Sequence, residues 1–113
     1  MDNITNEQIN KEFGTIFQEY RLKNKITQEK LAEKLTKSTK TISQIETGKD
    51  GTSKKTDIDF MNLLGITPNT LYKKFITDPA LKRRIELDER INKLNCDKID
   101  ALFQIIEVLN QLK

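Results

Sequence analysis

The sequence has 113 residues, a formal net charge of +3 and 33% charged residues, which suits one small globular domain with an appendage. Its 35% hydrophobic content, two prolines and four glycines argue against a disordered chain. It contains no histidine and a single cysteine, Cys96, which excludes histidine-based nucleophiles, histidine-ligated metals and an internal disulfide. We therefore expect no enzyme, no cofactor and no metal site.

The sequence carries no signal for a membrane or for export. No apolar run approaches the roughly 18 residues of a spanning helix, and the chain begins with the polar residues 1–3 rather than with a basic and then apolar leader. We expect a cytoplasmic protein with no membrane partner.

The positive charge is concentrated in one block. Residues 21–55 hold ten basic and four acidic residues, whereas residues 78–113 hold seven of each. A localised basic field favours a polyanionic partner, because neutralising phosphates releases condensed counterions. A solvated lysine-rich helix face is the alternative explanation.

The N-terminal residues predict one long amphipathic helix. Thr5 and Gln8 form a capping-box pattern, and Gly14 weakens the middle of the segment, which leaves open a start near Phe13. The helix is expected to end near residue 24. Apolar residues recur at steps of three and four along it: Ile9, Phe13, Ile16, Phe17 and Tyr20.

Two short helices with a tight polar turn follow. Thr27 caps a helix predicted over residues 28–35, and Ser38 caps one over residues 39–47, which Gly48 ends. The inward residues are expected to be Leu31, Ala32, Leu35, Ile42 and Ile45. The outward face of the second helix consists of Thr39, Lys40, Ser43 and Gln44. Such a protruding polar helix fits the major groove of DNA.

The sequence after residue 48 also predicts helices and contains no pattern typical of a strand. A polar loop is predicted over residues 49–56, then short helices over 57–64, with Ile58, Met61 and Leu64 apolar, and over 68–75. Asp78 and Pro79 mark a boundary, after which helical arms are predicted over residues 79–94 and 98–112. The last arm has eight apolar residues in fifteen, more than a single stripe requires.

From Phe13 to Phe75 the sequence resembles the Cro and phage-repressor type of helix-turn-helix domain, also called lambda-repressor-like. The resemblance implies an all-α chain: a five-helix lambda-repressor-like DNA-binding domain at residues 1–77, with its motif at 28–47, followed by a C-terminal helical hairpin at 78–113. The residues that carry it are Arg21, 27–35, Ser38, 41–46, Gly48, Lys49, 64–67 and Leu71.

The resemblance also implies roles for single residues. Base edges are expected to be read by Thr39, Lys40, Ser43 and Gln44, with Gln44 suited to adenine and Lys40 to guanine or a phosphate. Arg21 and Glu46 match a structural ion pair of the family. DNA phosphates are expected to be held by Gln28, Lys37, Thr47, Lys49 and Lys54.

Two positions depart from the family pattern. Thr36 stands where glycine is usual, so it must adopt a left-handed conformation at a cost of roughly 1 kcal/mol, or the turn must differ. Asp57 stands where an apolar residue is common, which predicts a loosely packed fourth helix.

These observations predict a sequence-specific transcriptional regulator, nucleoid-associated, that binds double-stranded DNA as a homodimer and represses from a palindromic operator. The hairpin is expected to dimerise, because one recognition helix reads only a few base pairs. The expected dimerisation residues are Ile105, Val108, Leu109 and Leu112. The alternatives are a hairpin that folds back on its own domain, or an antitoxin-like or inhibitory module that binds a protein partner through residues 78–113.

Overall fold

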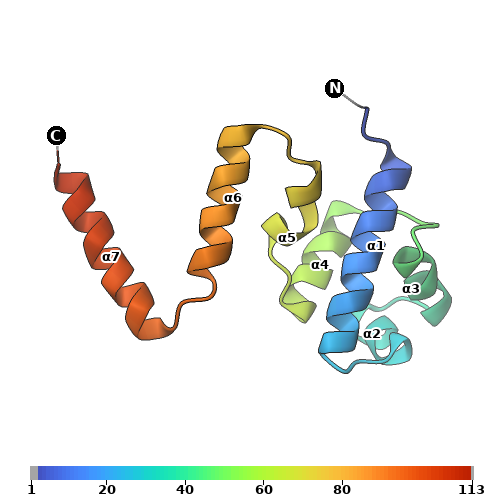
Figure 1. The fold of residues 1–113 in the computed structure, drawn as a ribbon. Helices are drawn as coiled ribbons and strands as arrows, with labels where there is room; N and C mark the ends of the chain where they lie inside the picture. The colour runs from blue at the N-terminus through green and yellow to red at the C-terminus, as the bar shows by residue number, and fades with distance from the viewer. Residues whose placement is uncertain (1–2, 113) are drawn as a thin grey trace. The chain divides into compact units, whose positions relative to one another are not determined.

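The computed structural model describes residues 3–112, which form α-helices and one 3-10 helix without a strand. Contacts divide the chain into two units, one ending at Phe75 and one beginning at Ile76 (Figure 1). The all-α class predicted from the sequence is confirmed. The helices are α1 (Asn6–Lys23), α2 (Gln28–Leu35), α3 (Thr39–Glu46), α4 (Lys54–Leu64), α5 (Pro68–Tyr72), η1 (Lys73–Phe75), α6 (Pro79–Ile91) and α7 (Cys96–Gln111).

The capping box fixes the start of α1. The Thr5 hydroxyl accepts from the backbone N–H of Gln8 at 3.1 Å, and the Gln8 side chain accepts from the backbone N–H of Thr5 at 2.9 Å. The helix therefore begins at Asn6, and the alternative start near Phe13 is wrong. Gly14 lies where α1 crosses α3: a Cβ there would sit 2.3 Å from the carbonyl oxygen of Ile45.

One hydrophobic core holds the first unit together, with a large side chain from each of its five α-helices. The rings of Phe17 in α1 and Phe60 in α4 stack at a centroid distance of 4.1 Å. Burying a side chain of this size contributes about 1.5–3 kcal/mol. The five largest fully buried residues are Phe17, Phe60, Leu31, Ile42 and Leu71.

The fourth helix begins one turn earlier than predicted. Ser53 is its N-cap and accepts from the backbone N–H of Thr56 at 3.1 Å, so Lys54 lies in the first turn of α4 and not in a loop. In α4, Phe60 and Leu64 are buried, whereas Ile58 is 52% exposed. The expected loose packing is wrong, because α4 supplies a fully buried ring to the core.

The second unit has no buried residue between Ile76 and Leu112. Asn95 lies between the two predicted arms, and it is the N-cap of α7, where it accepts from the backbone N–H of Lys98 at 2.9 Å. Cys96 is therefore already helical, two residues before the predicted start of the last arm. Large apolar side chains of α7 and of its C-cap Leu112 are exposed to solvent: Phe103, Ile105, Ile106, Val108, Leu109 and Leu112.

Candidate nucleic-acid interface

The turn between α2 and α3 is closed by backbone hydrogen bonds. Thr36 has φ 56° and ψ 47°, so the turn keeps the left-handed conformation although this residue is not glycine, which is the first of the two expected alternatives. This conformation lets the N–H of Lys37 reach the carbonyl of Ala32 at 2.9 Å. The side chain of Ser38 then caps α3 by accepting from the N–H of Thr41 at 3.0 Å. Local chemistry thus sets the direction in which α3 leaves α2.

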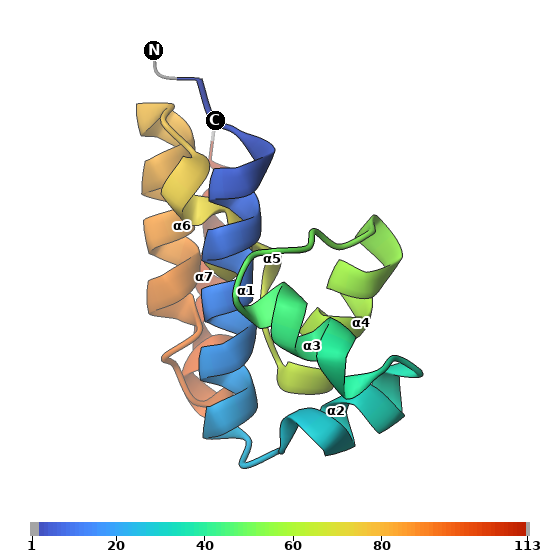
Figure 2. The same ribbon diagram turned by 90° about the vertical axis from the view of Figure 1, so that its right-hand side faces the viewer.

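Helix α3 has one buried and one accessible face. Ile42 and Ile45 point into the core, with 0% and 4% exposure. On the other face, Thr39 and Lys40 are exposed and Ser43 and Gln44 are half-buried. Figure 2 shows α3 turned toward the viewer, with α2 next to it and α1 alongside. The structure therefore brings the four predicted base-reading residues together on one accessible polar face.

A buried ion pair fixes the end of α3 to α1. Arg21 donates through Nε to Oε2 of Glu46 at 2.6 Å and through Nη2 to Oε1 at 3.2 Å. Its remaining Nη1 donates to the carbonyl of Ile26 at 2.9 Å. Both residues are buried, and in the described residues no buried side-chain polar atom lacks a partner. Arg21 and Glu46 therefore pair as the resemblance implies.

Gln28 is the third member of this network. Its Nε2 donates to Oε1 of Glu46 at 2.9 Å, which orients the side chain at the N-terminus of α2. An amide nitrogen carries two N–H groups, so one remains for a phosphate. Thr47 differs from Gln28 in that its hydroxyl donor is already used within the helix. The hydroxyl lies within hydrogen-bonding distance of the carbonyls of Ser43 and Gln44, at 3.0 and 3.2 Å. A phosphate bond from Thr47 would require that hydroxyl to rotate.

A hollow of about 410 Å³ lies beside α3, between Lys37 and the N-terminus of α4. Lys37 is half-buried at its edge, and Lys49 and Lys54 are exposed nearby in the sequence. The sequence did not single out the hydroxyl groups in this hollow, although serine at position 53 is a favoured N-cap residue. The hollow is lined by Lys37, Thr41, Ile45, Asp50, Gly51, Thr52, Ser53 and Thr56.

Asp57 follows the lining residue Thr56 in α4 and is 8% exposed. Its carboxylate accepts a hydrogen bond from the hydroxyl of Thr52, which ties the α3–α4 loop to α4. Burial raises the pKa of the Asp57 carboxyl above its ordinary value of 3.8, and the bond from Thr52 lowers it in part.

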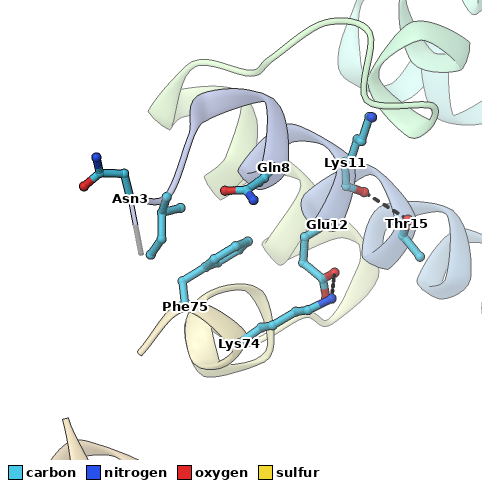
Figure 3. Close-up of a pocket in the computed structure, with 8 residues that line it drawn as sticks. Asn3, Gln8, Lys11, Glu12, Thr15, Lys74 and Phe75 are labelled. Carbon is cyan, nitrogen blue, oxygen red and sulfur yellow. Dashed lines mark hydrogen bonds and ion pairs between the residues drawn. The ribbon is translucent and has the colours of Figure 1, made fainter. Parts of the chain in front are cut away.

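A second hollow, of about 420 Å³, lies between α1 and η1 and contains none of the predicted DNA contacts. Figure 3 shows the ion pair of Lys74 and Glu12, at 2.9 Å, and the ring of Phe75 on its floor. Within residues 3–112, three or more metal-binding side chains do not cluster anywhere. No helix in the same range is long and apolar enough to cross a bilayer.

Comparison with known proteins agrees with the geometry. Residues 17–71 match a family model described as helix-turn-helix. No curated protein and no solved structure matches the chain. The matched residues run from the core ring Phe17 to the core residue Leu71 and include α2, its turn and α3. They form a helix-turn-helix domain of the Cro and phage-repressor type, the domain of a DNA-binding regulator.

Proposed function

We propose that this protein is a sequence-specific transcriptional repressor that binds a palindromic operator as a homodimer. The observation that carries the proposal is the outward face of α3: Thr39, Lys40, Ser43 and Gln44 offer donors, acceptors and a cation without an apolar side chain. A polar helix face of this width fits the major groove, where each base pair presents a distinct pattern. Repression follows when the bound protein occludes a promoter.

Within this face, Gln44 is suited to a bidentate pair with adenine and Lys40 to the acceptors of guanine. Thr39 and Ser43 flank them with hydroxyl groups. Phosphate contacts from Gln28, Lys37, Lys49 and Lys54 then fix the register of the domain on the duplex. The hollow beside α3 supports this arrangement, since Lys37 lies at its edge and Lys54 follows its lining residue Ser53.

The homodimer is proposed to form through α7. Ile105, Val108 and Leu109 in α7 and its C-cap Leu112 are 56% to 67% exposed, and an exposed apolar patch of this kind is typical of an interaction surface. A two-fold dimer supplies the second recognition helix that a palindromic operator requires.

Mobility shifts on matched and scrambled duplexes test the assignment of the base-reading face. Gln44→Ala and Lys40→Ala should each weaken operator binding by about 1–3 kcal/mol and relax the preference at one base position. Lys93→Ala removes the same charge from the second unit and serves as the matched control, with unchanged base preference. Undiminished discrimination in both α3 variants would refute the assignment.

A further inference from the structure

Arginine is rare in this chain and is concentrated in α6. Of the 20 basic residues, 16 are lysines and four are arginines. One arginine, Arg21, is buried and binds both carboxylate oxygens of Glu46. The other three, Arg83, Arg84 and Arg90, lie within eight consecutive residues of α6. Because arginine can bind a carboxylate or a phosphate through two parallel hydrogen bonds, this concentration indicates an anionic partner for α6.

The three arginines of α6 face one hollow. At about 100° per residue, Arg83, Leu87 and Arg90 fall on one side of the helix, and Arg84 lies next to them. The hollow has a volume of about 390 Å³ and is lined by Arg83, Arg84, Glu86, Leu87 and Arg90. An anion at this side of α6 can therefore approach more than one guanidinium group. We call the three arginines the arginine surface.

Two of these arginines have no counter-charge in the protein. Arg90 pairs with Glu86, at 2.8 Å between Nη2 and Oε1. Within residues 3–112, no carboxylate pairs with Arg83 or Arg84, and both residues are exposed. Their N–H groups are therefore available to an anion from outside the protein.

The preceding residue adds to this charge. Residues 78–113 are balanced in charge as a whole, but residues 79–85 contain three consecutive cations, beginning with Lys82, and no acid. Lys82 is also exposed. A local field of this kind attracts a polymer of phosphates, because each phosphate that is neutralised releases condensed counterions. The charge pattern of α6 therefore favours a phosphate backbone over a single small anion.

We infer that the arginine surface binds the phosphate backbone of the DNA that the first unit holds. This inference rests on DNA binding by the proposed regulator and adds a sequence-independent contact from the second unit. DNA is the polyanion favoured by the rest of the chain, because residues 17–71 form a helix-turn-helix domain. Only residues 76–78 join the two units, so α6 meets a duplex held by the first unit at a high effective concentration.

Phosphate contacts can be recognised by the salt dependence of binding. Each neutralised phosphate adds about 0.9 to the slope of the logarithm of the binding constant against the logarithm of the salt concentration. Arg83→Gln combined with Arg84→Gln removes two charges and keeps residues that favour a helix. The magnitude of this slope should therefore fall by about 1.8. The loss of affinity in the variant should shrink about tenfold between about 50 and about 200 mM salt.

Fluorescence anisotropy of a labelled duplex of scrambled sequence, titrated with the full-length protein, measures these slopes. The scrambled duplex is chosen because phosphate contacts do not require an operator. The matched control is Lys93→Gln combined with Lys98→Gln, which removes two exposed charges from the same unit and should leave the slope unchanged. Arg83→Lys combined with Arg84→Lys keeps both charges and should keep most of the slope.

Three results would overturn the inference. The first is an unchanged slope in the double glutamine variant of α6, and the second is an equal decrease in the matched control. The third is a decrease in the double lysine variant as large as in the glutamine variant, which would assign the arginines a structural role. Arginine-dependent binding to vesicles that contain phosphatidylserine, together with the unchanged slope, would assign the surface to a membrane instead.

The test also separates this inference from the proposed function. A decrease of the slope as expected, together with binding-site selection that recovers no repeat, would support the phosphate contact and reject the sequence-specific repressor. An unchanged slope together with recovery of an inverted repeat would reject the phosphate contact and support the repressor.

Discussion

Glu46 accepts three hydrogen bonds, two from Arg21 and one from Gln28, on a side chain with 0% exposure. Its carboxylate therefore links α1, α2 and the last turn of α3. A buried carboxylate is tolerated only with such partners, because its desolvation costs several kcal/mol. This contact and the core together hold α3 against α1 and α2.

Removal of one partner of this pair should lower the free energy of unfolding more than removal of both partners. Glu46→Ala leaves the guanidinium of Arg21 buried without its counter-charge and should lower the free energy of unfolding by about 3–5 kcal/mol. The double variant Arg21→Met with Glu46→Leu replaces both charges by apolar groups and should lose less. Urea unfolding measures both values. A single variant as stable as the wild type would contradict this role of the pair.

Asp57 should give the free energy of unfolding a pH dependence of known sign. Because burial raises its pKa in the folded state, the folded protein holds this proton more tightly than the unfolded chain. Its contribution to stability is present at low pH and is lost as the pH rises through 3.8 toward the folded value. Asp57→Asn keeps an acceptor for Thr52 and removes the titration.

We therefore expect Asp57→Asn to gain stability relative to the wild type as the pH is raised from about 3 to about 7. Urea unfolding of both proteins at several pH values measures the difference. A difference between wild type and Asp57→Asn that shrinks with rising pH would contradict the sign.

At the scale of the helices, the sequence was sufficient to predict those helix ends that depend on contacts between neighbouring residues. The predicted bounds of α2 and the start of α3 agree with the structure, because Thr27 and Ser38 each bond the N–H three residues on. The left-handed Thr36 follows from the short turn in the same way. These ends depend on contacts within a few residues.

Where the role of a residue depends on a contact with a distant part of the chain, the sequence did not reveal that role. Gly14 reads as a helix-weakening residue, yet its role is the close crossing with Ile45, 31 residues away. Phe60 lies inside the predicted helix, yet its role is the stacking of its ring on Phe17, 43 residues away. The hollow beside α3 joins residues of four segments, namely the α2–α3 turn, α3, the α3–α4 loop and α4, so no local pattern identifies it.

The two units differ in how their helices are stabilised, which predicts the effect of truncation. All buried residues of the core lie between Phe13 and Leu71, and none lies between Ile76 and Leu112. A chain of residues 1–77 should therefore fold with a cooperative thermal transition, yet sediment as a monomer and bind operator weakly. Circular dichroism and sedimentation velocity measure both properties. A truncated chain that still sediments as a dimer would reject α7 as the interface.

At the scale of the whole molecule, charge and apolar surface are divided between the two units. The ten basic residues of residues 21–55 belong to the unit that contains α3, whereas residues 78–113 are balanced in charge and rich in exposed apolar side chains. Phosphate attraction is thus concentrated around the helix-turn-helix, and association around α7. This division of charge and apolar surface suits the proposed homodimer, in which each chain binds one half-site of the operator.

Unbiased binding-site selection with the full-length protein tests the central proposal most directly. We expect an inverted repeat whose half-site centres lie about 10–10.5 base pairs apart, or a multiple of that spacing. The same selection with Gln44→Ala should return the repeat with one position per half-site relaxed, symmetrically in the two halves. Recovery of no repeat, or of an identical repeat with both proteins, would contradict the reading of DNA by the outward face of α3.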